Sequence, residues 1–166
     1  MLVADRNMTM RERGFTLTEA LVVLSIVAVM VAIGAPNLSH LIASMNARSA
    51  SFDLIGDLAL ARSEAIKRNG TVRVEPVVGT NWAQGWRVVA EATPTFPATT
   101  LRQREALHGA LSVVGANSLV FQPNGRIGAD TAPGNASWRI TSTNATPRCV
   151  VITPTGSARS KVGESC

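Results

Sequence analysis

The sequence predicts an α+β protein in which one long N-terminal helix, with a membrane-spanning first half, packs on a small antiparallel β-sheet. Three observations lead to this prediction. An apolar run with a single charge lies near the N-terminus, apolar residues at helical spacing follow it, and segments of alternating polarity begin beyond Gly70. The chain has 166 residues, which suits one domain plus an elongated element, because single cores are typically built from about 100 to 150 residues.

The apolar run extends over residues 15–35 and carries a single charged side chain, that of Glu19. A helix of these 21 residues is long enough to cross the hydrocarbon core of a bilayer, which is about 30 Å thick. A carboxylate costs about 2.5 to 3.5 kcal/mol at the centre of a membrane and less near its surface. Glu19 therefore either reaches towards water or has a partner in the membrane.

The apolar run differs from a secretory signal peptide. Arg11 and Arg13 come directly before it, and no small-residue cleavage site follows it until Gly34-Ala35-Pro36, where a further helical pattern begins. We therefore expect the segment to stay with the protein. Arginine before the span places the N-terminus in the cytoplasm and the rest of the chain outside it.

The residues GFTLTE at 14–19, followed by the apolar run, resemble the type III signal of type IV pilins and type II secretion pseudopilins. The resemblance implies that a prepilin peptidase cuts after Gly14, so that residues 1–14 are a leader peptide, and that Phe15 is methylated. It also implies that Glu19 pairs with the N-terminal amine of a neighbouring subunit. Two charges that are each costly in lipid would then offset one another.

The helical spacing continues beyond the span and predicts an amphipathic helix over residues 37–68, so that one helix covers 15–68, with the transmembrane part at about 15–36. Pro36 removes a backbone donor and is expected to kink this helix. Asn69-Gly70 is a typical end signal. We expect the membrane half to pack on other subunits and the second half to pack on the head.

The head is expected over residues 69–166, where the pattern changes to strands. Segments separated by Gly, Pro, Asn and Ser are expected to form strands at 71–75, 86–89, 111–114, 118–121, 138–142 and 148–153. Residues 90–100 are expected to form a loop. The sequence thus predicts a small antiparallel sheet against the helix.

Three further segments are similar to the GspH/FimT/FimU group of minor pilins and H pseudopilins: ARSEAIKR at 61–68, WAQGW at 82–86 and FQPNG at 121–125. This resemblance implies a pilin fold. It implies as partners other minor and major pilins or pseudopilins, a prepilin peptidase and an inner-membrane assembly platform. The favoured role is a minor pilin that primes or caps a type IV pilus, and the alternative is pseudopilin H of a type II secretion system. Either role implies a single-pass inner-membrane protein with a periplasmic head, later incorporated into a pilus or pseudopilus.

The two cysteines, Cys149 and Cys166, lie in the last 18 residues. In an exported domain such a pair is expected to form a disulfide, which on the loop-entropy model contributes about 3 kcal/mol. Two free thiols in a cytosolic protein are the alternative interpretation.

Enzymatic chemistry finds little support in the sequence. His40 and His108 are isolated, the cysteines have no histidine neighbours, and GRIG at 125–128 lacks the lysine and the strand-to-helix context of a phosphate loop. We interpret GRIG as a β-turn. The sequence predicts no catalytic residue, metal site or cofactor.

DNA binding is a third hypothesis. The formal net charge is +5, and five basic residues follow Phe121 against Asp130 and Glu164: Arg126, Arg139, Arg148, Arg159 and Lys161. Phosphate contacts need such a patch, although scattered basic residues usually form a solvated face. The segment GSAR at 156–159 resembles the Gly-Arg-x-Arg motif of DNA-binding FimT-like pilins. The first arginine of that motif is replaced by Ser157, which counts against the hypothesis.

Overall fold

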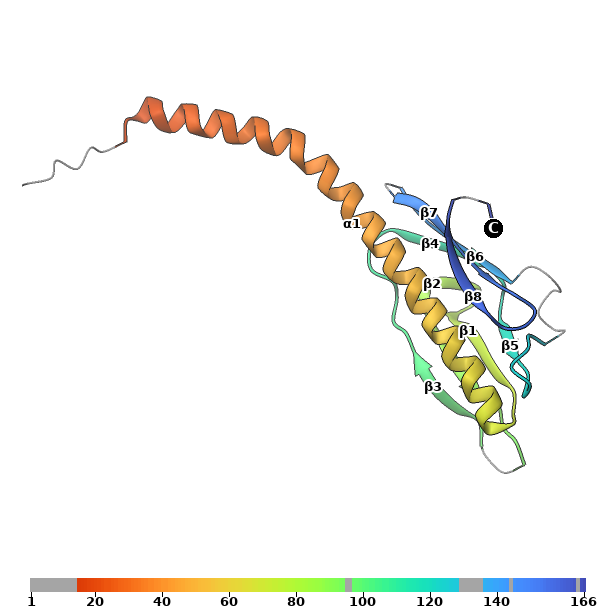
Figure 1. Cartoon of the computed structure of the whole chain (residues 1–166). Helices are drawn as coiled ribbons and strands as arrows, with labels where there is room; N and C mark the ends of the chain where they lie inside the picture. Colours follow the sequence, from red (N-terminus) through yellow and green to blue (C-terminus); the bar gives the residue numbers. More distant parts are fainter. Residues whose placement is uncertain (1–14, 95–96, 129–135, 144, 164) are drawn as a thin grey trace, which may run out of the picture. The chain divides into compact units, whose positions relative to one another are not determined.

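The computed structural model describes residues 15–94, 97–128, 136–143, 145–163 and 165–166, with the backbone alone at residues 35 and 36. The predicted leader, including Gly14, lies outside the described residues. The described chain contains one long helix, α1 (Leu17–Arg68), followed by eight strands. It forms two compact units, Met1–Leu38 and Ser39–Cys166. The α+β class predicted from the sequence is confirmed (Figure 1).

The first unit contains the early turns of α1. Among the described residues, α1 is the one helix long and apolar enough to cross a membrane, and none of its most apolar window is buried. The Ser25 hydroxyl donates to the Val22 carbonyl at 2.7 Å, so this polar group is satisfied within the helix. Residues 20–34 of α1 thus present an apolar surface on all sides.

The later turns of α1 belong to the second unit and pack on the sheets through a narrow stripe. Its buried apolar residues recur every three or four positions: Ala47, Ala50, Leu54, Leu58, Ala61 and Ala65. Four of these six are alanine, which lets the helix backbone approach the sheets closely. Figure 1 shows these turns crossing the strands of the first sheet.

The end of α1 lies where the sequence predicts it. Asn69 has a positive φ of 48°, and the Gly70 N–H donates to the Ala65 carbonyl at 3.1 Å. This is the Schellman arrangement, which satisfies a carbonyl group left open at the end of a helix. The chain then turns directly into the first strand.

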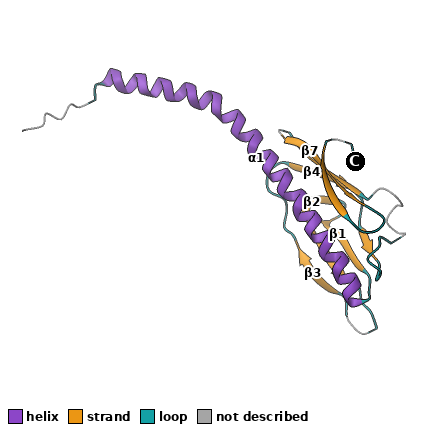
Figure 2. Ribbon diagram, viewed as in Figure 1, coloured by secondary structure: helices purple, strands orange, loops and turns teal. Residues whose placement is uncertain are grey.

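Two antiparallel four-stranded sheets form the rest of the second unit (Figure 2). The first has the order β3-β2-β1-β5, with β1 at Val72–Val78, β2 at Asn81–Ala90, β3 at Thr99–Gln103 and β5 at Leu119–Phe121. The second has the order β4-β6-β7-β8, with β4 at Leu111–Gly115, β6 at Ser137–Ser142, β7 at Ala145–Ile152 and β8 at Ala158–Val162.

The three tryptophans join these layers in one core. The rings of Trp82 and Trp138 meet edge to face with centroids 5.2 Å apart, and Trp86 lies 6.3 Å from Trp82. All three are buried. The Trp82 Nε1–H donates to the Ala116 carbonyl at 2.8 Å, which satisfies its polar atom.

The sequence prediction missed two strands and the division into two sheets. The six expected strands correspond to β1, β2, β4, β5, β6 and β7, whereas β3 and β8 were not expected, and β3 begins inside the expected loop 90–100. Both missed strands lie at an edge of a sheet and are largely exposed. They therefore lack the alternation of apolar residues that reveals a half-buried strand.

Candidate assembly surfaces

Phe15 and Glu19, the residues singled out for processing and assembly, lie just before α1 and in its first turn, respectively. The Thr16 hydroxyl accepts the Glu19 backbone N–H at 3.3 Å, so Thr16 caps the helix and Glu19 stands three residues after the cap. This Thr-x-x-Glu spacing is that of a capping box, and an acid in the first turn also favours the helix dipole. The sequence analysis missed this local role, although the spacing was readable.

Both residues are exposed within the single chain. The backbone of α1 is helical through position 36, while the Pro36 side chain lies outside the described residues. The kink expected at Pro36 therefore stays a prediction. The surface available for assembly in the first unit is the apolar helix itself, with the carboxylate of Glu19 at its start.

In the second unit α1 has an exposed apolar stripe besides its buried one. Met45, Phe52, Ala59 and Ile66 follow one another at intervals of seven and share a face. Met45, Phe52 and Ile66 are all more than half exposed. The Arg48 guanidinium lies 5.6 Å from the centre of the Phe52 ring. An exposed row of large apolar side chains on a helix is typical of an interaction surface.

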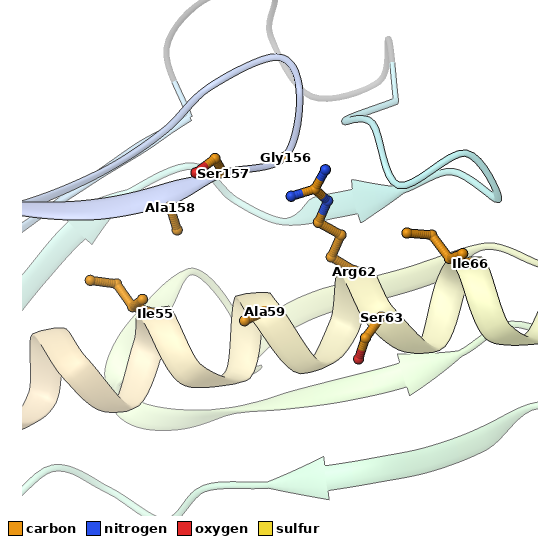
Figure 3. Close-up of a pocket in the computed structure, with 8 residues that line it drawn as sticks. All are labelled: Ile55, Ala59, Arg62, Ser63, Ile66, Gly156, Ser157 and Ala158. Atoms are coloured by element: carbon orange, nitrogen blue, oxygen red, sulfur yellow. The ribbon is translucent and has the colours of Figure 1, made fainter.

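A groove lies between this helix and the turn that joins β7 to β8 (Figure 3). It has a volume of about 380 Å³ and is lined by Ile55, Ala59, Arg62, Ser63, Ile66, Gly156, Ser157 and Ala158. Figure 3 shows the Ala158 side chain pointing towards the helix between Ile55 and Ala59. The groove is mainly apolar, with the Arg62 guanidinium beside Gly156 as its charged group.

Arg62 also holds two turns together at the end of the groove. Its Nε–H donates to the Gly125 carbonyl at 3.1 Å. Gly125 and Gly156 both have positive φ, 73° and 83°, and each closes a turn by donating its N–H at 2.8 Å. A Cβ on Gly156 would lie 2.3 Å from the Gly125 carbonyl oxygen. This close approach explains why glycine stands in both the FQPNG and the GSAR segments.

Substituting Gly156 by alanine is expected to lower the free energy of unfolding by about 2 kcal/mol or more, because a side chain is strained at this φ and has no space there. Gly56→Ala provides the opposite control. Gly56 is exposed inside α1 with nothing within 4 Å of a new Cβ, so alanine should stabilise the chain by up to about 1 kcal/mol. Denaturant titration of the full chain in detergent measures both. Equal effects of the two substitutions would contradict the close packing at Gly156.

A buried carboxylate on α1 forms a network that the sequence analysis missed. Asp57 is fully buried and accepts hydrogen bonds from Trp86 Nε1–H at 3.0 Å, Arg102 Nη1–H at 3.0 Å and Arg104 Nε–H at 2.8 Å. Arg104 also pairs with Asp53, with 3.2 Å between Nη2 and Oδ1. The hydrogen bond to Asp57 raises the pKa of Arg104 above its ordinary value, although burial opposes the shift.

These hydrogen bonds connect β2, β3 and the segment after β3 to α1. The sequence does contain a signal for this network. Asp57 precedes Leu58 and falls within the spacing of three and four residues that marks the buried face of α1. An acid on the buried face of a helix needs partners. The sequence could therefore have indicated that arginine or tryptophan contacts this position.

The five basic residues proposed for DNA contact do not form one cluster. Arg139 and Lys161 lie in one row across β6, β7 and β8, with Cys149 between them, and two strand spacings separate them by about 10 Å. Arg159 stands two residues before Lys161 and shares its face. Arg148 is adjacent to Cys149 and therefore points to the other face.

Arg126 lies apart from these strands, in the turn after β5, where its N–H donates to the Asn124 side chain at 3.0 Å. The acidic residues weighed against the patch, Asp130 and Glu164, lie outside the described residues. Three of the five cations, Arg139, Arg159 and Lys161, thus share the outer face of the second sheet, the face turned away from the core.

A disulfide joins Cys149, buried in β7, to Cys166, with Cα atoms 5.6 Å apart. It ties the residues after β8 back to the sheet. Within the described part of the chain, no group of three or more His, Cys, Asp or Glu side chains is placed to hold a metal ion. His40 lies in α1, and His108 lies in the loop before β4.

Two family models match the chain. The family described as type II transport protein GspH matches residues 50–156, which is more than half of the chain, and the prokaryotic N-terminal methylation motif matches residues 9–35. No curated protein gives a significant match.

Among solved structures, two crystal structures of the type IV minor pilin FimU of Pseudomonas aeruginosa (strain PAO1) are similar to this chain, with TM-scores of 0.59 and 0.58. Each is 22% identical in sequence and aligns with 72% of this chain, and the alignments cover 93% and 98% of the FimU chains. At this identity the similarity shows the fold, which is the pilin fold expected from the sequence.

Proposed function

Because the chain belongs to the GspH family of minor pilins and pseudopilins, we propose that it is a non-enzymatic minor subunit of a type IV pilus that primes or caps the fibre. The observation that carries the proposal is the exposed apolar first part of α1, which lies within the matched N-terminal methylation motif. Such a helix buries its surface in a membrane before assembly. In a fibre it buries the same surface against the helices of neighbouring subunits.

In this proposal residues 1–14 are a leader that the prepilin peptidase removes after Gly14, and Phe15 becomes the methylated N-terminus. Residues 15–36 then span the inner membrane once, with the N-terminus in the cytoplasm. Residues 37–68 continue as the amphipathic part of the helix, and residues 69–166 form the periplasmic head. The assembly platform of the inner membrane and other pilins are the partners.

Glu19 has a specific task in this assembly. Its carboxylate stands in the first turn of α1, four residues after Phe15, which carries the new N-terminal amine in this proposal. Opposite charges from two subunits that meet in lipid offset the cost that each would have alone. The pairing selects the register in which subunits stack, because a shift leaves both charges unpaired.

The second candidate is pseudopilin H of a type II secretion system. The observation that favours it is the matching family model, whose description is a type II transport protein. Both candidates use the same helix, the same processing and the same fold. They differ in the machine that receives the subunit.

Deletion of the gene separates the two machines. We expect the deletion strain to lose surface pili and twitching motility while it secretes exoproteins at the wild-type level, because a priming subunit is needed to start fibres. Electron microscopy, a twitching assay and an exoprotein assay measure these outcomes, and expression of the full chain should restore pili. Normal pili together with lost secretion would instead assign the chain to the secretion machine.

A DNA-binding role has one structural observation in its favour, the three cations Arg139, Arg159 and Lys161 on one face. Cations on a common face provide the phosphate contacts that non-specific binding requires. Arg126 and Arg148 lie elsewhere, so the patch is smaller than the sequence suggests. Retardation of duplex DNA by the full chain at low salt tests this role.

A further inference from the structure

The last strand of the second sheet has an open edge. β8 pairs with β7 alone in the order β4-β6-β7-β8. Thr153 N–H bonds to the Ser157 carbonyl and Gly163 N–H to the Pro147 carbonyl, both at 2.9 Å. In an antiparallel pair the hydrogen-bonded residues alternate. Residues 157, 159, 161 and 163 therefore direct their backbone groups at β7.

The residues between them direct their backbone groups away from β7. These are Ala158, Ser160 and Val162, and within the described residues their N–H and carbonyl groups have no hydrogen-bond partner beyond the strand edge. An unpaired edge of this kind accepts an added strand. β8 contains no proline or bulge that would prevent such pairing.

The two faces beside this edge differ in chemistry. On the inner side lies the groove between α1 and the turn that joins β7 to β8, which reaches β8 at Ala158 and has the Arg62 guanidinium at its end. Within the described residues Arg62 uses only Nε, on the Gly125 carbonyl, so its Nη N–H groups remain available. On the outer side the exposed side chains of β8 are Arg159 and Lys161.

We propose that the open edge of β8 binds an extended segment of another subunit of the same assembly, in which aliphatic residues alternate with Asp or Glu. The inference rests on the proposed function, since a fibre subunit has neighbours that can supply the segment. The added strand becomes the fifth strand of the second sheet. Its aliphatic side chains enter the groove along α1, and its carboxylates lie opposite Arg159 and Lys161, where cross-strand pairs of opposite charge are favourable.

The mixed character of the site favours a polypeptide over a nucleic acid. Only a polypeptide presents amides at the spacing of a strand edge, and only alternating side chains can serve an apolar groove on one face and cations on the other. Phosphate recognition would use the cations and leave the apolar groove exposed to water. The edge therefore selects an extended acidic segment.

The probe is a blocked hexapeptide of alternating residues, Ac-Val-Glu-Val-Glu-Val-Glu-NH2, added to the full chain in detergent micelles. Amide hydrogen exchange resolved by residue is the measurement. In the free chain we expect the amides of Ala158, Ser160 and Val162 to exchange fast and those of Arg159 and Lys161 to exchange slowly. The peptide should slow the first three by about tenfold or more at saturation. A peptide with lysine in place of glutamate should bind about tenfold more weakly or worse.

Two substitutions of Ser160 test whether the outward backbone N–H groups of β8 bind the peptide. Ser160→Pro removes an outward N–H and leaves the bonds to β7 in place, as proline at an edge strand allows, and Ser160→Ala keeps the N–H. We expect binding to be lost in the proline variant and kept in the alanine variant. If the proline variant fails to fold, the exchange pattern of the unaltered chain still decides.

The inference is overturned if the three amides are not protected by the glutamate peptide, or if the lysine peptide binds equally well. Protection of the same amides by duplex DNA in place of the peptide would also overturn it. None of these measurements requires a fibre. A negative result with the peptide would therefore leave the proposed function standing. The proposed function is tested separately, by the deletion strain.

Discussion

Replacing Asp57 by alanine is expected to lower the free energy of unfolding of the chain by about 3 kcal/mol. The substitution removes the acceptor of three hydrogen bonds from a fully buried position and leaves the Trp86 N–H without a partner. Breaking a buried ion pair typically costs about 3 to 5 kcal/mol. The lower value applies because the side chains of Arg102 and Arg104 are 48% and 35% exposed and can turn to water.

Denaturant unfolding of the full chain, followed by tryptophan fluorescence, measures this loss, since all three tryptophans lie in the core. Asp53→Ala is the matched control, one helical turn earlier on α1. The Asp53 side chain is 40% exposed and, among the residues that the structure describes, pairs with Arg104 alone, so its loss should cost about 1 kcal/mol or less. An Asp57→Ala variant as stable as the Asp53→Ala variant would show that the network contributes nothing beyond a surface pair.

The long helix and most strands could be predicted because their signals are local. The apolar run, the three-and-four spacing and the Asn69-Gly70 end signal are each contained within a few residues of the sequence. The same holds for the strands with alternating burial, such as β1. The edge strands β3 and β8 carry no such signal. Each has a neighbouring strand on one side only, and most of its own side chains are exposed.

The contacts that hold the second unit together are distant in the sequence. Asp57 contacts Trp86 across 29 residues, Arg102 across 45 and Arg104 across 47, and nothing in the sequence near either arginine indicates this partner. The cations show the same limit. A count of charges placed Arg148 with Arg139 and Lys161, whereas strand alternation puts Arg148 on the other face and the register of three strands decides which cations meet.

The processing site and the assembly role of Glu19 are predicted from the resemblance, and the position of Glu19 after Thr16 offers a competing local role. Glu19 stands three residues after Thr16, whose hydroxyl accepts its backbone N–H, and this is the spacing at which the carboxylate of a capping box acts. A helix-capping residue stabilises its own chain, while a paired charge acts between chains. The two roles give different results on substitution.

Glu19→Ala is expected to reduce incorporation of the chain into fibres by about a hundredfold, because the N-terminal amine of its neighbour would lose a partner worth about 2.5 to 3.5 kcal/mol in lipid. Immunoblots of the sheared fibre fraction against the membrane fraction measure incorporation. Intact mass of the membrane-extracted variant should show the chain without residues 1–14, so that the loss is assigned to assembly and not to failed cleavage.

Glu19→Gln and Thr16→Ala separate the two roles of this turn. Glutamine keeps the side-chain acceptor that a capping box uses but has no charge, so Glu19→Gln should fail to incorporate as Glu19→Ala does. Thr16→Ala removes the cap, at a cost of about 1 kcal/mol in the helix, but keeps the carboxylate, so it should enter fibres nearly as the unaltered chain does. Normal incorporation of Glu19→Gln would mean that Glu19 serves its own helix and that another contact sets the register between subunits.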